Sequence, residues 1–304
     1  MSVERLRLHD QGPEFSRIVY GAWRLADGAT LPGAAEVRAL IEGCLELGIT
    51  SFDHADIYGG YRCEELFGAA LKETPSLRER IEIISKCDIC LVDGARPKHR
   101  VKHYDTSAAH IRDSVDRSLR LLHCDYLDLL LLHRPDPLFD ADESAAELER
   151  LIRAGKIRHV GVSNFLPHQV ELLASRLQAP IVTNQVEFSV LRHGVMLDGT
   201  LDQCQRLRMR PMAWSPLAGG RLFDASEPKA QALLSLLGRL GEGYGLSAEG
   251  MALAWILRHP STPLPVVGTS RIARIRSAAE ASKVKLERQD WFEIYEAASG
   301  REVP

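Results

Sequence analysis

The sequence predicts an α/β protein folded as a (β/α)8 barrel, and three observations support this prediction. Short apolar runs alternate with longer amphipathic stretches, and eight such runs occur along the chain. Successive runs begin about 30 residues apart, which is the usual length of one βα unit. The chain has 304 residues, and one barrel typically takes about 250. Because no Gly-Ser linker or change of composition divides the sequence, we expect residues 1–304 to form a single domain.

Each expected strand is a short apolar run between amphipathic stretches. The clearest is the leucine-rich run that ends at Leu132, whose near-continuous apolar character suits a strand covered on both faces. In chain order, the expected strands span residues 17–20, 50–52, 81–85, 126–132, 159–162, 181–185, 209–214 and 264–267.

The intervening stretches have the apolar spacing of helices. In residues 34–47, the side chains of Val37, Leu40, Ile41 and Cys44 recur at intervals that bring them to one helical face. An open, doubly wound sheet shows the same alternation, but eight strands and the lack of a GxGxxG turn after the first of them favour the closed barrel. Further helices are expected at residues 106–122, 144–154, 167–175 and 247–258, with a C-terminal helical extension at 287–299 packed over the barrel.

Composition and charge argue against several classes of protein. The formal net charge is -3 and no long basic stripe is present, which disfavours a nucleic-acid-binding protein. The densest basic stretch, residues 96–103, is interpreted as a solvated loop, with a phosphate-contacting lip as the alternative. No apolar run approaches the roughly 18 residues of a membrane-spanning helix. The segment MSVERLRLHDQG is charged and lacks the apolar core of a secretory signal, so a cytoplasmic location is the default expectation.

The cysteines and histidines show no strong disulfide or metal pattern. The six cysteines do not form a disulfide framework in a chain of this length. Cys87 and Cys90 form one CxxC, which is a weak zinc or redox signal without a second pair, and we interpret both as reduced thiols beside a strand end. The eleven histidines form no HxxxH or HxH cluster with nearby carboxylates, so no metal site is expected.

Polar side chains follow three neighbouring strands at the points where these strands end. Asp53 and Tyr58 follow the second strand, Lys86 follows the third, and His133 follows the fourth. Because barrel active sites are built at the C-terminal ends of the strands, we expect the four side chains to converge on one mouth. Taken singly, they have ordinary explanations: a helix N-cap, a half-buried ring, a surface lysine and a core histidine. At successive strand ends, they favour a catalytic site.

These residue types suit the reduction of a carbonyl group. A tyrosine with a pKa of about 10 is a weak acid at neutral pH, and a neighbouring ammonium is expected to lower that pKa. Lys86 supplies the ammonium, while Asp53 compensates its charge and fixes its position. His133 can donate a hydrogen bond to a carbonyl oxygen, which polarises the carbon for hydride attack. Tyr58 can then protonate the alkoxide that forms.

Eight segments of the chain contain these four residues and the other motifs of interest. In chain order they are GAWRL, GITSFDHADIYGGYRCEELFGAAL, IISKCD, DYLDLLLLHRPDP, GKIRHVGVSNF, TNQVEFSVL, WSPLAGGRL and VVGTSRIAR. In these segments and in this order, the chain resembles the aldo-keto reductase family from about Val19 to the C-terminus. Within the family it is similar to bacterial YdhF-like oxidoreductases. The resemblance implies a TIM barrel, NADPH as cofactor, an aldehyde or ketone as the small-molecule substrate, and Asp53, Tyr58, Lys86 and His133 as the catalytic tetrad.

The resemblance also assigns positions that bind the cofactor. Ser163, Asn164 and Gln185 would hold the nicotinamide carboxamide, and Trp214 stands where family members usually carry a tyrosine stacked on the nicotinamide ring. The segment after the eighth strand has hydroxyls and arginines before a helix, which suits a phosphate, although a capped helix with a solvated basic face is the alternative. The resemblance assigns this segment to the adenosine 2′-phosphate, which favours NADPH over NADH. The full set is Gly21, Trp23, Ser163, Asn164, Gln185, Trp214, Ser215, Pro216, Leu217, Gly219, Gly220, Arg221, Gly268, Thr269, Ser270, Arg271 and Arg274.

The sequence departs from the family pattern at two places, one expected to contact the adenine of the cofactor and one expected to line the substrate pocket. Family members often carry a Glu-Asn pair that contacts adenine where this chain has Ser277 and Ala278. The loop with GGYRC, between Tyr58 and Glu64, is longer than in many relatives and is a candidate to reshape the substrate pocket. The residues expected to line that pocket are Trp23, Arg24, Tyr61, Arg134 and Phe165. The two arginines are interpreted either as anion-binding groups or as solvated rim charges.

Two other functions fit parts of the pattern. A barrel lyase could form a Schiff base on Lys86, although this leaves Tyr58, His133 and the GTSRIAR segment unexplained. A cofactor-binding protein that senses redox state and turns over slowly is the second alternative. The sequence does not indicate an oligomeric state, and a monomer is compatible with it.

Overall fold

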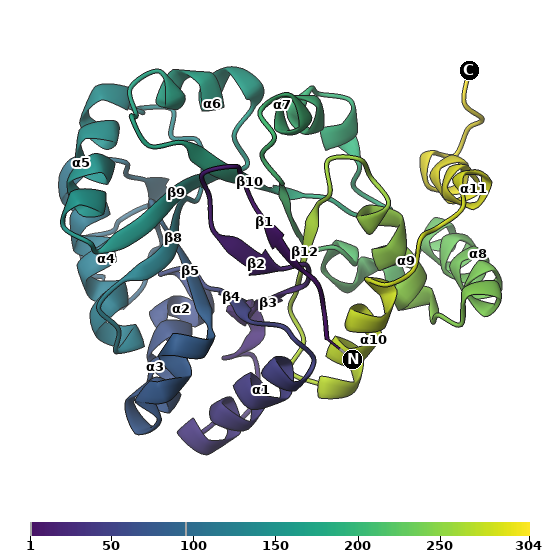
Figure 1. Cartoon of the computed structure of the whole chain (residues 1–304), viewed down its shortest axis with the longest axis horizontal. Helices are drawn as coiled ribbons and strands as arrows, with labels where there is room; N and C mark the ends of the chain where they lie inside the picture. Colours follow the sequence, from purple (N-terminus) through teal and green to yellow (C-terminus); the bar gives the residue numbers. More distant parts are fainter. Residues whose placement is uncertain (1, 95) are drawn as a thin grey trace.

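The computed structural model describes residues 2–94 and 96–304, and its centre is a closed barrel of eight strands in the order β10-β11-β12-β3-β4-β5-β8-β9 (Figure 1). All neighbouring strands in the barrel run parallel. The predicted (β/α)8 barrel is therefore confirmed. The barrel strands are β3 (Val19–Gly21), β4 (Ser51–Asp53), β5 (Glu82–Cys87), β8 (Leu127–Leu132), β9 (Ile157–Ser163), β10 (Ile181–Glu187), β11 (Met212–Trp214) and β12 (Leu264–Val267).

Each of the eight predicted strands corresponds to one barrel strand, with small differences at the ends. In β8 all six residues are buried, as the near-continuous leucine run predicted. Strand β11 begins at Met212 and not at Met209. The residues before Met212 do not pair with a barrel strand. The Arg210 amide donates to the Leu8 carbonyl at 2.8 Å, and Pro211 has no amide hydrogen with which to bond a neighbouring strand.

The helices surround the barrel (Figure 1). Those predicted from the sequence correspond to α1, α4, α5, α6, α9 and α11. Ser107 and Asp140 cap α4 and α5 by accepting hydrogen bonds from backbone amides of the first turn. The α-helices are α1 (Ala34–Glu46), α2 (Tyr58–Tyr61), α3 (Cys63–Glu73), α4 (Ala108–Leu122), α5 (Ala141–Arg153), α6 (Pro167–Ala174), α7 (Thr200–Arg206), α8 (Pro228–Tyr244), α9 (Ala248–Leu257), α10 (Ile272–Ala281) and α11 (Arg288–Ser299). Short 3-10 turns are η1 (Ala22–Arg24), η2 (Pro75–Arg80), η3 (Gly194–Met196) and η4 (Ala218–Phe223).

The C-terminal helix α11 packs on the outer layer of the molecule, beside α8 and beyond α9 (Figure 1). The indole rings of Trp255 in α9 and Trp291 in α11 stack with centroids 5.0 Å apart. Each indole N–H also donates to the other residue's backbone carbonyl, at 3.1 and 3.0 Å. The predicted helical extension is confirmed, and these paired contacts fix its position.

Two hairpins were not expected from the sequence. Strands β1 (Arg5–Arg7) and β2 (Glu14–Ser16) pair antiparallel across the N-terminal end of the barrel, where the Ser16 amide donates to Ser51 Oγ at 3.0 Å. Strands β6 (Ile89–Cys90) and β7 (His103–Tyr104) form the second hairpin, which follows β5 at the opposite end. Strands of two or three residues are too short for the alternation of polar and apolar residues to identify them in a sequence.

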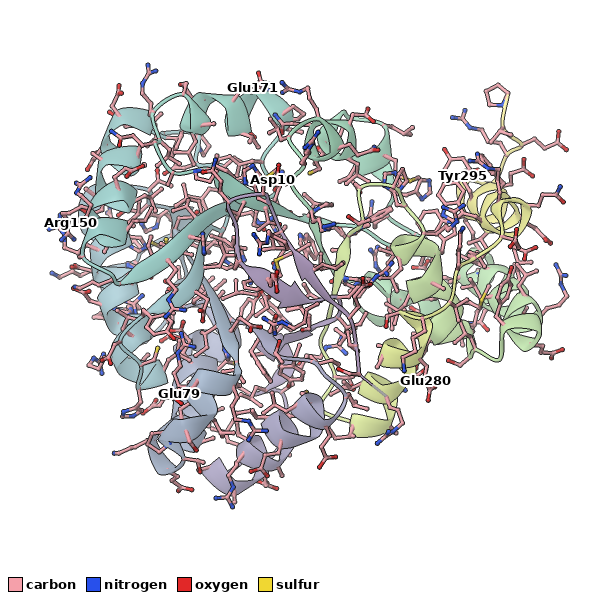
Figure 2. The ribbon with its side chains drawn as sticks, in the orientation of Figure 1. Asp10, Glu79, Arg150, Glu171, Glu280 and Tyr295 are labelled. Carbon is pink, nitrogen blue, oxygen red and sulfur yellow. The ribbon has the colours of Figure 1, made fainter. Side chains whose placement is uncertain are left out.

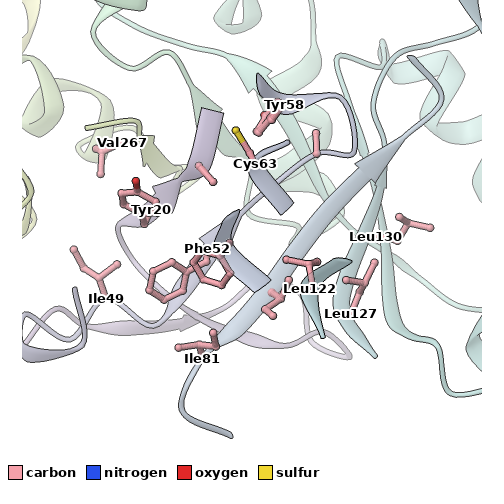
Figure 3. Close-up of a cluster of buried hydrophobic side chains, with 14 of the residues drawn as sticks. Tyr20, Ile49, Phe52, Tyr58, Cys63, Ile81, Leu122, Leu127, Leu130 and Val267 are labelled. Carbon is pink, nitrogen blue, oxygen red and sulfur yellow. The ribbon is translucent and has the colours of Figure 1, made fainter. Parts of the chain in front are cut away.

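The apolar core has two layers. Inside the barrel, the N-terminal hairpin contributes Leu8 and Phe15 to a cluster with residues of six barrel strands. Between the strands and the helices, a larger cluster contains Tyr20 and Phe52, whose ring centroids lie 5.7 Å apart (Figure 3). Charged side chains such as Arg150 project from the outer helices (Figure 2). No helix within the described residues combines the length and apolar character needed to cross a membrane.

Candidate active site

A single cavity of about 450 Å³ opens at the C-terminal end of the barrel strands. Its walls include Asp53 at the end of β4, His133 directly after β8, Ser163 at the end of β9 and Trp214 at the end of β11. Residues from these separate strands meet because all strands of the barrel point the same way. Three of the four polar side chains that the sequence singled out therefore line this cavity, namely Asp53, Tyr58 and His133.

A buried ion pair lies beneath this cavity. Lys86 Nζ is 2.8 and 2.7 Å from the two oxygens of Asp53, and it donates to the His54 carbonyl at 2.7 Å. Gln185 Nε2 donates to Asp53 Oδ1 at 2.8 Å, which satisfies the carboxylate further. Burial lowers the pKa of Lys86, while the Asp53 carboxylate opposes this change. Removing either charge would leave the other buried without compensation, so the pair holds both side chains in place.

The hydroxyl of Tyr58 accepts a hydrogen bond from Lys86 Nζ at 2.9 Å. An ammonium group can only donate, so the proton of Tyr58 Oη is directed away from Lys86. Tyr58 also lines the cavity, and its ring packs edge-on against Trp23 with centroids 4.9 Å apart. The hydroxyl of Tyr58 therefore lies beside both Lys86 and Asp53, on a residue that lines the cavity.

The pKa of Tyr58 differs from the sequence-based expectation. Burial, followed by the nearby Asp53 carboxylate, raises the pKa of Tyr58 well above its ordinary value. The expected lowering by Lys86 was wrong for the structure without ligands, because Asp53 compensates the ammonium charge and the ring is removed from water. The consequence is that Tyr58 carries its proton at neutral pH, as a proton donor must.

Two consecutive glycines place Tyr58. Gly59 and Gly60 have φ angles of 60° and 64°, in the left-handed region that favours glycine. A Cβ atom on Gly59 would lie 2.6 Å from the Cβ of Ala26 and 2.7 Å from Cys63 Sγ. The Gly-Gly pair therefore lets the chain reverse directly after Tyr58 and enter α3.

His133 is buried beside Tyr58, with ring centroids 6.1 Å apart. Burial, and then the positive charges of Lys86 and Arg134, hold the pKa of His133 well below its ordinary value. The imidazole is therefore neutral and has one N–H group to donate. Among the described residues, its Nδ1 atom has no hydrogen-bond partner. The ring lines the cavity, where its N–H can hold an oxygen atom.

A chain of hydrogen bonds joins the ends of three strands. Trp214 Nε1 donates to Asn164 Oδ1 at 2.9 Å, and Asn164 Nδ2 donates to Ser163 Oγ at 2.8 Å. Ser163 Oγ in turn donates to the Gln185 carbonyl at 2.7 Å. Asn164 has a φ angle of 63°, a left-handed conformation that asparagine tolerates better than most residues. These contacts fix polar groups and an aromatic ring on one wall of the cavity.

Comparison with known proteins identifies the family. The sequence profile described as "Aldo/keto reductase family" matches residues 17–299. The chain belongs to the aldo/keto reductase family. It is 51% identical to "Oxidoreductase YdhF" of Escherichia coli, over 99% of this chain and 100% of that protein. It is 49% identical to "6-dehydroglucose reductase" of Agrobacterium fabrum, again over 99% and 100% of the two chains.

A solved structure agrees with this assignment. The glycerol dehydrogenase AKR11B4 from Gluconobacter oxydans superposes with a TM-score of 0.84 at 25% identity, over 98% of this chain and 95% of that chain. Aldo-keto reductases act on carbonyl groups as oxidoreductases and use nicotinamide cofactors. This chain is therefore an oxidoreductase enzyme, and its cavity lies where a barrel of this family carries its active site.

Most predicted site residues of this aldo-keto reductase lie on the cavity wall. Lys86 is the exception within the predicted tetrad, because it lies beneath Tyr58 and contacts that side chain from below the cavity. Among the residues predicted for the cofactor and substrate, those that line the cavity are Gly21, Trp23, Arg24, Arg134, Ser163, Asn164, Gln185, Trp214, Ser215, Pro216, Leu217, Gly219, Gly220, Gly268, Thr269 and Arg274.

Five predicted residues are not on this wall. Phe165 is only 2% exposed and belongs to the apolar core. The hydroxyl of Tyr61 accepts from the Leu91 amide at 2.9 Å, so its ring is held against the β6–β7 loop. Arg221 Nε donates to the Ala218 carbonyl at 3.2 Å. Ser270 and Arg271 are exposed before α10 and are also absent from the lining. For these five, proximity in the chain was a poor guide to where the side chain points.

The cavity also contains residues that were not predicted. Glu249, in the first turn of α9, has a carboxylate oxygen 3.6 Å from Arg274 Nε. Ser277 and Ala278, which replace the family's Glu-Asn pair, do line the cavity. Further lining residues are Phe223, Leu253, Val266 and Val267. Glu249 and Leu253 come from a helix and not from a strand end, so the strand-end criterion could not find them.

A buried carboxylic acid behind the ion pair predicts how stability depends on pH. Glu64 accepts hydrogen bonds from Ser85 at 2.6 Å and Ser118 at 3.0 Å. Burial raises the pKa of Glu64 to about 7. The folded protein therefore holds the proton of the Glu64 carboxyl more tightly than the unfolded chain does. This difference contributes to the free energy of unfolding at low pH, and the contribution is lost as the pH rises through 7.

The Glu64→Gln variant should therefore match the wild type in unfolding free energy near pH 4.5 and exceed it by roughly 3 kcal/mol at pH 8. Gln keeps the shape of the protonated acid, and serine hydroxyls can reorient toward it. Urea denaturation at a series of pH values measures the difference. A difference that does not change with pH would show that Glu64 is ionised in the folded protein throughout.

Proposed function

We propose that this chain is an NADPH-dependent reductase of aldehydes or ketones, with Asp53, Tyr58, Lys86 and His133 as its catalytic tetrad. One observation carries the proposal. One cavity is lined by Tyr58 and His133 and also by Arg274. A dinucleotide is long enough to present its reactive ring to the first pair while a phosphate reaches the arginine.

The residues along this cavity suit NADPH at each position. Trp214 offers an aromatic face for the nicotinamide ring, and the Asn164–Ser163 chain offers polar groups for its carboxamide. Gly219 and Gly220 have φ angles of 68° and 100°, so the η4 loop presents backbone to the cavity without Cβ atoms. Arg274 can hold a 2′-phosphate by charge-assisted hydrogen bonds. When bound, the reduced nicotinamide supplies the hydride.

The protein groups then complete the reaction. His133, held neutral, donates its N–H to the carbonyl oxygen and polarises the carbon. Tyr58 transfers its phenolic proton to the oxygen as the alkoxide forms, and the product leaves as an alcohol. The phenolate left on Tyr58 is stabilised by Lys86, which is already hydrogen-bonded to this oxygen. Asp53 keeps the ammonium in position, and water returns the proton to Tyr58 before the next turnover.

The geometry favours reduction over a Schiff-base mechanism. A Schiff base requires an unprotonated lysine that can attack a carbonyl carbon. Lys86 Nζ instead contacts Asp53, the His54 carbonyl and Tyr58, and it is covered by Tyr58. A redox-sensing protein with slow turnover would bind the same cofactor, so measured turnover separates it from the reductase. The relative named 6-dehydroglucose reductase makes a sugar aldehyde the first substrate to test.

The cofactor proposal makes a specific prediction for Arg274. The Arg274→Ala variant should raise the Kd for NADPH by about 10-fold or more, because a charge-assisted contact with the phosphate is lost. The Kd for NADH, which lacks this phosphate, should change little. Quenching of tryptophan fluorescence on titration measures both values, since Trp214 lies on the cavity wall.

Glu249→Gln is the matched control for this experiment. Glu249 lies 3.6 Å from Arg274 and lines the same end of the cavity, but its negative charge opposes a phosphate. The control should bind NADPH as tightly as the wild type or more tightly. Equal weakening of NADPH and NADH by Arg274→Ala would contradict a role for Arg274 at the 2′-phosphate.

A further inference from the structure

Arg134 is a positively charged residue at the reacting end of the cavity, and its backbone is rigidly held. It directly follows His133 after β8, and its amide donates to both oxygens of the buried Asp88 carboxylate, at 3.2 and 3.1 Å. Its side chain lines the cavity, with the guanidinium carbon 5.5 Å from the centroid of the Trp214 ring. The anchored backbone and the aromatic neighbour position this guanidinium.

The guanidinium of Arg134 forms no ion pair with the described residues, whereas the other cavity arginines are engaged. Arg24 donates to the Gly219 carbonyl at 3.0 Å, and Arg274 lies 3.6 Å from Glu249. Asp88 is buried, and both of its carboxylate oxygens accept from the Arg134 backbone amide. A half-buried cation that faces a cavity without a protein counter-ion is suited to a negatively charged ligand.

The charge of Arg134 acts at the catalytic groups. It lowers the pKa of both His133 and Tyr58, which places it within electrostatic range of the two side chains proposed to hold a carbonyl oxygen. Lys102, in the basic loop before β7, also lowers the pKa of His133.

We propose that Arg134 binds an oxyanion of the substrate, so that the preferred substrates are aldehydes or ketones that also carry a carboxylate or a similar acidic group. This inference rests on the proposed reductase function and specifies its substrate class. The planar guanidinium matches the two oxygens of a carboxylate, and Arg134 lines the same cavity as His133. The guanidinium of Arg134 could also donate hydrogen bonds to the hydroxyls of a sugar. The experiment below separates binding of an anion from binding of a neutral hydroxyl group.

The test compares 4-carboxybenzaldehyde with 4-nitrobenzaldehyde, which has nearly the same shape but no charge, as substrates of the wild type and of Arg134→Gln. The wild type should prefer the carboxylate by at least about 10-fold in kcat/KM, as expected for one charge-assisted pair. Arg134→Gln should abolish this preference, because it should raise KM for the carboxylate much more than KM for the nitro compound. Arg24→Gln is the control, because its guanidinium is tied to Gly219, and it should retain the preference.

Several results would overturn the inference. A wild type without preference for the carboxylate, or a preference that survives in Arg134→Gln, would show that Arg134 does not bind an anion. Binding is measured independently by titrating both proteins with 4-(hydroxymethyl)benzoate, the expected product, and following tryptophan fluorescence. Binding to the wild type that is lost in Arg134→Gln supports the anion site even if no aldehyde is reduced. Absence of NADPH oxidation with every aldehyde would instead contradict the proposed reductase function.

Discussion

Replacement of Tyr58 by phenylalanine is expected to lower kcat for carbonyl reduction by roughly 10²- to 10⁴-fold, the range attributed to a positioned general acid. The substitution removes only Oη, the atom that accepts a hydrogen bond from Lys86 Nζ at 2.9 Å. The ring that packs on Trp23 is kept, so the shape of the site should be preserved. Steady-state kinetics with a reducible aldehyde measures the loss.

The Kd for NADPH provides the control for Tyr58→Phe. Because the proposed cofactor contacts come from Trp214, Asn164 and Arg274, the variant should bind NADPH almost as tightly as the wild type. A variant that binds NADPH normally and turns over at close to the wild-type rate would show that another group donates the proton. The proposed mechanism would then be wrong at its central step.

The second large effect is expected for Lys86→Met, which removes one partner of the buried ion pair. Breaking a buried pair by removing one charge typically destabilises a protein by about 3–5 kcal/mol, because the other charge stays buried. In this variant, Asp53 would keep only the hydrogen bond from Gln185, at 2.8 Å. We expect a fall of this size in unfolding free energy, measured by urea denaturation, together with loss of turnover.

The double variant Lys86→Met with Asp53→Asn separates these two effects. It removes both charges, so much of the lost stability should return. Turnover should not return, since Tyr58 still lacks the ammonium that stabilises its phenolate. If the single variant fails to fold, the double variant still tests the catalytic role. Reduction at wild-type rates by the double variant would contradict that role.

The fold was predictable because its strands are buried on both faces. The leucine run of β8 and the apolar run of β12 are visible in the sequence for this reason. The hairpin of β1 and β2 was missed because its strands are short and charged, and it is held by contacts such as Ser16 with Ser51. Those contacts lie 35 residues apart in the chain, so no local pattern reveals them.

The candidate site was predictable where a side chain follows directly from a strand end. Asp53 and His133 were placed in this way, whereas Trp214 was assigned from the family resemblance. The method failed at Phe165, because Asn164 before it adopts a left-handed conformation and the phenyl ring turns into the core. It also missed Glu249, which reaches the cavity from a helix. The raised pKa of Tyr58 depends on burial and on the balance of two charges, which only the folded arrangement shows.

The central claim is that this cavity transfers hydride from NADPH to a carbonyl carbon. The most direct measurement uses NADPH deuterated at both C4 positions, with 6-dehydroglucose and a panel of aldehydes, and analyses the products by mass spectrometry. We expect NADPH oxidation to accompany formation of an alcohol that carries one deuterium on the former carbonyl carbon. An enzyme that binds NADPH but forms no labelled alcohol from any of these substrates would contradict the reductase assignment.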